Sequence, residues 1–127
     1  MTLNDQASIY LQIARMLEDG VLRGIYPEEE QAPSTNELAR AYSINPATAA
    51  KGINLLVDKG VLYKKRGIGM FVAAGAAGAI RAERREAFYE KYVTALVREG
   101  RSLGLTAGEM AEMVARAAKG GTHHDHE

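Results

Sequence analysis

The chain has 127 residues, with 16 basic residues, 16 acidic residues and no cysteine. This length suits one domain or one and a half, and the balanced charge argues against indiscriminate binding to polyanions. The lack of cysteine excludes disulfides, thiol catalysis and cysteine-bound metals. The longest small or apolar run, residues 70–80, is too short to span a bilayer, and no secretion signal begins the chain. We therefore expect a soluble cytoplasmic protein with no membrane partner.

The first predicted element is an amphipathic helix over residues 8–23. Its apolar side chains Ile9, Ile13, Met16 and Leu17 fall on one stripe. Polar residues such as Gln12 and Glu18 are expected mostly off the buried face, and Gly24 ends the helix. Residues 27–33 contain two prolines and three consecutive glutamates, which predicts an exposed loop.

Two short helices follow, separated by a tight polar break. Ser34 and Glu37 form a capping-box pattern that opens a helix over residues 35–42. Asn45 and Pro46 predict the start of a second helix over residues 46–59. Its inward positions are Ala49, Ile53, Leu56 and Val57, and its outward positions are Ala47, Thr48, Lys51, Asn54 and Asp58. Gly52, costly within a helix, suggests close packing against the preceding helix.

A basic-tipped β-hairpin comes next. Residues 61–63 and 70–72 are apolar runs with β-branched and aromatic members and predict two short strands. The tip between them consists of Lys64, Lys65, Arg66, Gly67, Ile68 and Gly69. The glycines allow positive φ and close approach to another surface. Residues 40–66 form a local cationic cluster in an otherwise neutral chain, made of Arg40, Lys51, Lys59, Lys64, Lys65 and Arg66, with Asp58 as the one acid among them.

The rest of the chain predicts a pair of helices with a wide apolar face. Residues 73–79 are alanine and glycine only, which suggests a hinge. A helix is expected over residues 80–103, ended by Gly104, and Thr106 with Glu109 opens another to about residue 118. Two such helices cannot bury their apolar faces alone, so a second copy of the segment is the most economical partner. The predicted dimerisation residues are Phe88, Tyr89, Tyr92, Val93, Leu96, Met110, Met113 and Val114.

These elements predict a mainly α fold with a small β-wing. A winged helix-turn-helix domain occupies residues 1–73, a hinge residues 74–79, a helical dimerisation unit residues 80–119, and a disordered tail residues 120–127. Such a domain uses one helix to enter a major groove of double-stranded DNA and a ribbon to grip the backbone.

Three segments together resemble the winged helix-turn-helix of the GntR family of bacterial transcription regulators: IYLQIARML, PSTNELARAYSINPATAAKGINLLVDKGVL and YKKRGIGMFV. The short C-terminal helical pair resembles the YtrA-type subfamily. The resemblance implies a homodimeric DNA-binding repressor that recognises a palindromic operator. It covers about the first three-fifths of the chain by motif and the remainder by length and helical character.

The resemblance also assigns DNA contacts by motif position. Ser34, Thr35 and Asn36 would meet phosphates at the start of the first short helix. Residues at the base-contacting end of the next helix would be Asn45, Ala47, Thr48 and Lys51, and those in the wing would be Lys64, Lys65, Arg66, Gly67 and Gly69. Many family members carry arginine where this chain has Asn36, and the loop at residues 27–33 is more acidic than the family pattern.

Other functions stay open at this stage. One alternative is a protein-interaction module that uses Ile68, Phe71 and the C-terminal apolar stripe. Another is a sensor of a small effector or metal with a pocket at the dimer interface. The terminal His123, His124, Asp125 and His126 are suitable metal ligands but poorly preorganised, so we expect no metal site. No catalytic constellation or cofactor motif occurs, so we expect neither an enzyme nor a cofactor.

Overall fold

The computed structural model describes the backbone of residues 8–124 and the side chains of residues 8–120. Internal contacts divide the chain into two units, and we describe each by itself. Unit 1 ends at Glu83 and unit 2 begins at Arg84. Both units lack a helix that is long and apolar enough to cross a membrane, within the residues described.

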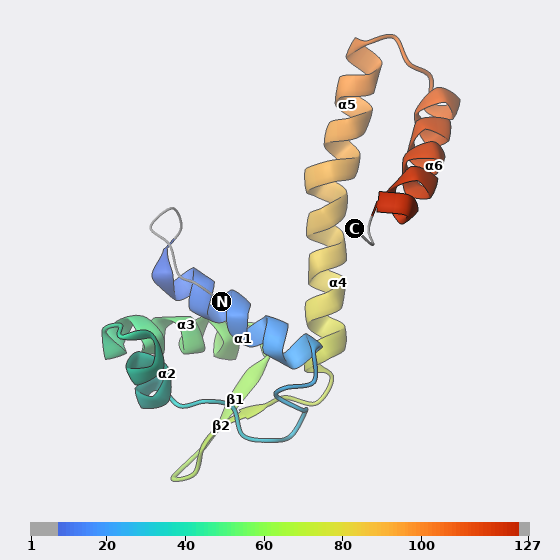
Figure 1. Cartoon of the computed structure of the whole chain (residues 1–127). Coiled ribbons are helices and arrows are strands. Elements are labelled where there is room, and N and C mark those ends of the chain that lie inside the picture. The colour runs from blue at the N-terminus through green and yellow to red at the C-terminus, as the bar shows by residue number, and fades with distance from the viewer. Residues whose placement is uncertain (1–7, 125–127) are drawn as a thin grey trace. The chain divides into compact units, whose positions relative to one another are not determined.

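Three helices and a hairpin make up most of unit 1 (Figure 1). They are α1 (Ile9–Leu22), α2 (Thr35–Tyr42), α3 (Pro46–Asp58), β1 (Leu62–Lys65) and β2 (Gly69–Val72). Both α1 and α2 pack against α3. The largest fully buried side chains are Ile13, Leu17, Ile53, Leu56, Val72 and Ile80. The predicted helices and hairpin are therefore confirmed, and the apolar stripes predicted for α1 and α3 supply most of this core.

Two polar side chains of α1 are buried, contrary to the prediction. Gln12 is 7% exposed and Glu18 is 5% exposed. Lys59 explains the burial of Glu18, because its Nζ lies 2.8 Å from Glu18 Oε2 and 2.7 Å from Glu83 Oε1. Burial by itself would lower the pKa of Lys59, but the bonds to Glu18 and Glu83 outweigh it and raise this pKa. The pairing lets a carboxylate sit inside the unit.

Gly52 packs closely, but against α1 and not against α2 as predicted. A Cβ at position 52 would lie 2.9 Å from the carbonyl oxygen of Tyr10 and 3.1 Å from Cγ2 of Ile13. Because α1 crosses α3 at this point, only a residue without a side chain lets the two backbones approach. The sequence located the close contact and misassigned the partner helix.

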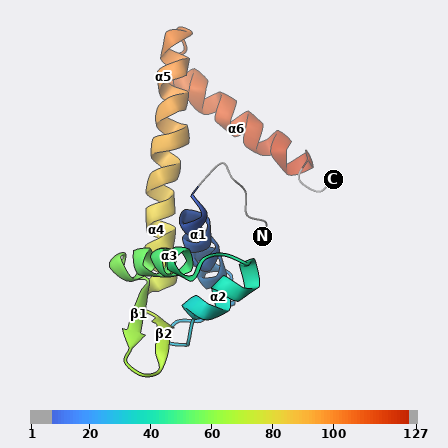
Figure 2. The ribbon, with the colours of Figure 1, turned by 90° about the vertical axis from the view of Figure 1, so that its left-hand side faces the viewer.

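The wing differs from its prediction at the strand ends next to the turn. Lys64 and Lys65 belong to β1, where they pair with Met70 and Gly69 of β2. The turn is thereby reduced to residues 66–68, closed by the bond from Ile68 N to Lys65 O at 3.0 Å. Figure 2 shows the hairpin extending away from the three helices. Strand pairing overrides the poor strand propensity of lysine.

Residues 29–32, predicted as an exposed loop, lie along the free edge of β2. Glu29 N donates to Val72 O at 2.7 Å, and Val72 N donates to Glu30 O at 3.0 Å. Ala32 N donates to Met70 O at 2.8 Å, and Gln31 forms an isolated bridge with Phe71. This added edge satisfies the outer backbone groups of β2.

Helix α4 (Ala76–Phe88) begins inside the segment that was predicted as a hinge. Its first residues join unit 1, since Ala76 and Ile80 are both buried in the core. Glu28 receives hydrogen bonds from Gly75 N at 2.8 Å and Ala77 N at 3.3 Å, so its carboxylate caps the helix. These contacts fix the start of α4 at Ala76, not at residue 80. Motion at this point stays a prediction.

Unit 2 contains the end of α4, a π-helical turn η1 (Tyr89–Val93), α5 (Thr94–Ser102) and α6 (Ala107–His124). The sequence predicted the helices without the π turn. The capping box that opens α6 is confirmed, because Thr106 N donates to Glu109 Oε1 at 2.8 Å and Glu109 N donates to Thr106 Oγ1 at 3.1 Å. In Figures 1 and 2, α5 and α6 approach at their connected ends.

The predicted end of this last helix at residue 118 is wrong, because α6 continues through Gly120 and Gly121 to His124. Glycine in a helix costs about 1 kcal/mol relative to alanine and does not forbid the conformation, and no proline follows. The disordered tail was predicted to start at residue 120. Its last residues, Asp125 and His126 among them, lie outside the described part of the chain.

Candidate nucleic-acid interface

The start of α2 carries the first group of predicted contacts. Ser34 Oγ accepts from Glu37 N at 3.1 Å, and Ser34 N donates to Glu37 Oε1 at 2.7 Å, so the predicted capping box is confirmed. These hydrogen bonds, the backbone one first, lower the pKa of Glu37. Ser34 and Thr35 are half-buried, and Asn36 is exposed. Because the cap uses a glutamate, no cation acts at this end, and hydrogen-bond donors of the first turn would have to supply any contact with phosphate.

A tight turn then sets α3 against α2. Ser43 adopts the left-handed conformation with φ 53°, and Asn45 Oδ1 accepts from Ala47 N at 2.7 Å. The side chain of Asn45 is therefore a helix cap, as predicted, which places it at the exposed start of α3. The helix-turn-helix geometry follows from these two local interactions and from the packing of α2 on α3.

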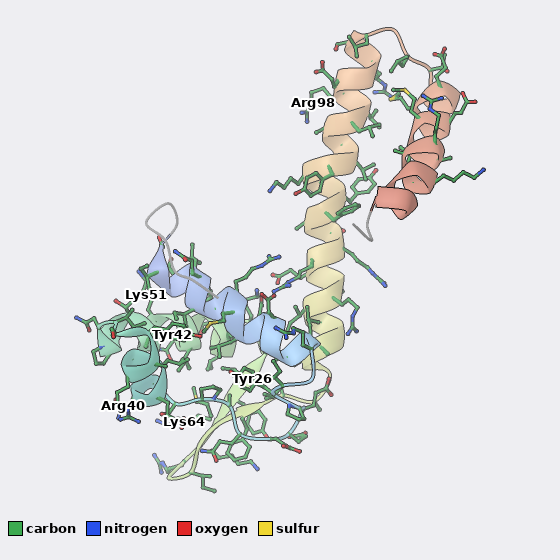
Figure 3. All side chains as sticks on the ribbon, viewed as in Figure 1. Tyr26, Arg40, Tyr42, Lys51, Lys64 and Arg98 are labelled. Carbon is green, nitrogen blue, oxygen red and sulfur yellow. The ribbon has the colours of Figure 1, made fainter. Side chains whose placement is uncertain are left out.

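The outward face of α3 remains largely open. Ala47, Lys51, Asn54 and Asp58 are exposed, while Thr48 is half-buried. The ammonium of Lys51 lies 4.2 Å from the centroid of the Tyr10 ring on α1, a cation–π contact that holds the side chain along the helix surface. Figure 3 labels Lys51 on this face and Lys64 on the wing. Sequence patterns gave no sign of the contribution from Tyr10.

The wing presents its cations on a supported hairpin. Lys64, Lys65 and Arg66 are exposed, and the ammonium of Lys65 lies 4.1 Å from the centroid of the Phe71 ring. Gly67 has φ 78° and Gly69 has φ 144°, conformations that favour glycine at the tip. The hairpin is therefore shaped by backbone and aromatic contacts, and its charged groups point to solvent.

Residues 29 and 31 add contacts to the wing that the sequence analysis missed. Tyr63 Oη donates to Glu29 Oε1 at 2.6 Å, and this bond, followed by desolvation, raises the pKa of Tyr63. Gln31 Nε2 donates to the carbonyl of Ile68 at 3.0 Å. A residue before a proline avoids the helical region, so the run leading to Pro33 was a signal for extended backbone. Nothing in the residue types indicated its partner.

The predicted cationic cluster is only partly available. Arg40, Lys51, Lys64, Lys65 and Arg66 are exposed on α2, α3 and the wing. Lys59 lies at the surface too, but it is paired with two glutamates of unit 1. A helix-turn-helix followed by a basic β-hairpin is the architecture of a winged helix-turn-helix protein, the class that the sequence predicted.

Residues 9–72 match the family described as "Bacterial regulatory proteins, gntR family". The chain belongs to the GntR family of transcription regulators, which confirms the resemblance identified in the sequence. Members of this family among its relatives are transcription regulators and not enzymes, as expected.

Three similar proteins show how far the likeness to this chain extends. A putative GntR-family regulator of Bacteroides thetaiotaomicron, known as a crystal structure, is 37% identical, with 87% of this chain and 96% of that one covered at a TM-score of 0.73. The HTH-type transcriptional repressor YtrA of Bacillus subtilis is 32% identical over 68 residues, which are 54% of this chain and 52% of that protein. The crystal structure of the AraR DNA-binding domain in complex with operator ORX1 is 27% identical, covering 57% of this chain and 93% of that one, at a TM-score of 0.51.

The extent of similarity varies among the curated relatives. The chain covers 30% of the length of one of them, 26% of another and 92% of a third. Similarity to the first two thus extends over less than a third of their length. Relatives that include YtrA, together with solved structures matched over most of this chain, support the predicted YtrA-type arrangement.

Proposed function

We propose that this protein is a homodimeric repressor that binds a palindromic operator, with α3 in the major groove and the wing against the neighbouring backbone. The observation that carries the proposal is the exposed face of α3, with Lys51, next in the chain to a wing that exposes Lys64, Lys65 and Arg66. The fold is that of the AraR domain solved with its operator, which supports the same use here. Repressors also occur among the curated relatives.

The interface separates positioning groups from groups that contact bases. Backbone N–H groups at the start of α2, near Ser34, Thr35 and Asn36, are placed for phosphates. Ala47, Thr48 and Lys51 on α3 offer a methyl group, a hydroxyl and a cation for the groove, and Asn45 caps the helix beside them. In the wing, the cations supply attraction to phosphates, while Gly67 and Gly69 allow the backbone to approach closely.

The exposed apolar face of unit 2 supports the homodimer. Phe88 is 59% exposed, Tyr89 55% and Tyr92 54%, and Leu96, Met113 and Val114 are at least 41% exposed. Val93 is half-buried in η1, and Met110 is the buried residue that packs α6 against Gly100 of α5. Isolated apolar side chains are common on surfaces, but a face this rich in aromatics indicates a protein partner. A second copy of the chain presents the same apolar face, so the two faces can cover each other.

Unit 2 has open hollows that the side chains of a second protomer can occupy. An apolar hollow of about 200 Å³ is lined by Leu96, Gly100, Leu103, Met110 and Met113. Ordinary ligand pockets measure about 300–1,000 Å³. Two larger hollows, of about 550 and 400 Å³, lie within that range of volumes, and all three are open to solvent. Apolar side chains of the second protomer fill such hollows by knobs-into-holes packing.

The test is to measure, by fluorescence anisotropy across a salt series, how tightly the protein binds fragments of the promoter of its own gene. Affinity should fall steeply with salt, because cations on α3 and the wing release counterions from the duplex. Lys51→Ala and Arg66→Ala should each weaken binding and lessen the salt slope by about one for each protomer bound. Arg23→Ala is the matched control, since it removes an exposed cation at the end of α1 outside the proposed interface.

Analytical ultracentrifugation with and without DNA tests the assembly. We expect a dimer that binds a fragment bearing two half-sites more tightly than a fragment bearing one. A protein that stays monomeric on its operator would overturn the dimeric arrangement. Equal affinity of wild type, Lys51→Ala and Arg66→Ala would overturn the assigned contacts.

A further inference from the structure

The tip of the wing is held by a side chain from a distant part of the sequence. Gln31, in the edge segment before α2, donates from Nε2 to the carbonyl oxygen of Ile68 at 3.0 Å. Ile68 is 62% exposed and directly follows Arg66 and Gly67 in the turn. The hydrogen bond therefore reaches the part of the hairpin that carries the proposed DNA contacts.

The geometry around Gly69 is adapted to this hydrogen bond. A Cβ built at Gly69 would lie 2.5 Å from Gln31 Nε2, so any other residue would displace the amide. The φ of 144° at Gly69 is a further reason for glycine. The wing glycine that the sequence suggested as a DNA contact thus has a second role, which is to leave room for the side chain of Gln31.

We propose that Gln31 is a positioning residue for DNA binding: its amide clamps the wing tip at Ile68 and orders Arg66 and Gly67 for contact with the duplex. This inference rests on the proposed function. The Gln31 clamp acts at the turn of the hairpin, while the backbone bonds of Glu29 to Val72 and of Ala32 to Met70 hold strand β2 behind it. Without the clamp, the turn keeps the bond from Ile68 N to Lys65 O and the Lys65–Gly69 strand pair beside it, but no side chain from outside the hairpin is recorded on Ile68.

The physical reason is preorganisation. A hairpin turn with two glycines loses conformational freedom when it docks, and that loss weakens binding. A hydrogen bond formed before docking removes part of this cost. One such bond contributes enough to change affinity about 3- to 10-fold. The gain in affinity depends on the contact that the tip makes with DNA, so it should vanish when the charged group at the tip is removed.

The experiment is a double-mutant cycle on the full chain. Gln31→Met keeps the length of the side chain and removes the donor, so it should weaken operator binding about 3- to 10-fold for each protomer bound. In an Arg66→Ala background the same change should have little further effect, because both changes remove one wing contact. Glu30→Gln is the control in the same segment, since Glu30 pairs with Val72 through its backbone, and it should not weaken binding.

Backbone amide NMR of the free protein provides a second measurement. Gln31→Met should lower the order parameters of Gly67 and Ile68 while the melting temperature stays within a few degrees of wild type. Unchanged order at the tip, or losses from Gln31→Met and Arg66→Ala that simply add, would overturn the clamp. If wild type shows no salt-dependent binding to any operator fragment, the proposed function fails, and the NMR comparison still decides whether Gln31 orders the wing.

Discussion

The two units use their apolar residues in opposite ways. In unit 1 the side chains of α1, α3, β2 and the start of α4 close over one another, and Leu56 is fully buried. In unit 2 the corresponding side chains face outward: Leu96 is 41% exposed, and Leu103 is 67% exposed. Met110 is the one large apolar side chain buried in the described part of unit 2.

This contrast indicates where each unit obtains its stability. Unit 1 has a core of its own, so its fold depends on packing within the chain. Unit 2 is a helical pair held by the contact of Met110 with Gly100 and by its caps. A pair of helices with so little buried surface needs association to be stable. The comparison predicts that similar substitutions act on folding in unit 1 and on assembly in unit 2.

Leu56→Ala should have the largest effect. Leu56 is fully buried in the core of unit 1, so its truncation removes buried methyl groups and leaves a cavity. We expect a loss of about 2–5 kcal/mol in the free energy of unfolding. Urea denaturation followed by circular dichroism measures it. A loss near zero would mean that unit 1 is not a close-packed domain, and the comparison with unit 2 would fail.

Lys59→Met should have the next largest effect on the free energy of unfolding. It tests whether the buried Glu18 depends on its ion pair. The change leaves Glu18, 5% exposed, without the ammonium that lies 2.8 Å away. A buried carboxylate that loses its charged hydrogen-bond donor costs about 1–3 kcal/mol, even where other partners remain. The matched control is Glu83→Gln, at the more exposed arm of the same network, which should cost about 0–1 kcal/mol. Equal effects of the two changes would show that the burial of Glu18 is unimportant.

Lys59 also gives a dependence on alkaline pH with a definite sign. Its pKa is raised above 10.5 in the folded protein, so the stabilisation is fully present below pH 10.5 and is lost as pH rises through the folded pKa. The difference in stability between wild type and Lys59→Met should therefore shrink above pH 10.5. Denaturation midpoints measured at pH 8 and at higher values provide the test.

Sequence periodicity was sufficient for features that depend on a few neighbouring residues. The capping boxes at Ser34 and Thr106, the Asn45 cap and the core stripe of α3 are local patterns, and each is present as predicted. The fold class followed from their order. The helix boundary at residue 118 failed because glycine weakens a helix without ending it.

Features that join distant segments could not be predicted in this way. Glu28 caps α4 across 47 residues of sequence, and Gln31 reaches Ile68 across 37. Both lie in an acidic segment that local rules assign to a solvated loop. The direction of Gly52 towards α1 depends on the crossing of two helices, which a single sequence does not specify. The cations of the candidate interface were identified from composition, and their supports Tyr10 and Gln31 were not.

Leu96→Ala tests whether a substitution in unit 2 acts on assembly. Leu96 is 41% exposed in the single chain, so truncation leaves a smaller internal cavity than at Leu56. If its exposed part is buried in a symmetric dimer, each copy contributes about 1 kcal/mol. The two copies together should raise the dimer dissociation constant about 30-fold. Sedimentation equilibrium over a concentration series measures this change, and the unfolding of unit 1 should be nearly unaffected.

Ser34→Ala should have the smallest effect, because it removes one hydrogen bond at the surface of unit 1. Loss of an N-cap hydroxyl costs about 1 kcal/mol of folding free energy. The reciprocal partner, Glu37, has a pKa lowered below 4.5, so its contribution is present above pH 4.5 and is lost as pH falls through the folded pKa. Urea midpoints of wild type should therefore decline below pH 4.5 more steeply than those of Glu37→Gln. Parallel acid profiles would show that the box gives no pH-dependent stability, which leaves the Ser34 hydroxyl and the buried residues Leu38 and Ala39 to order α2.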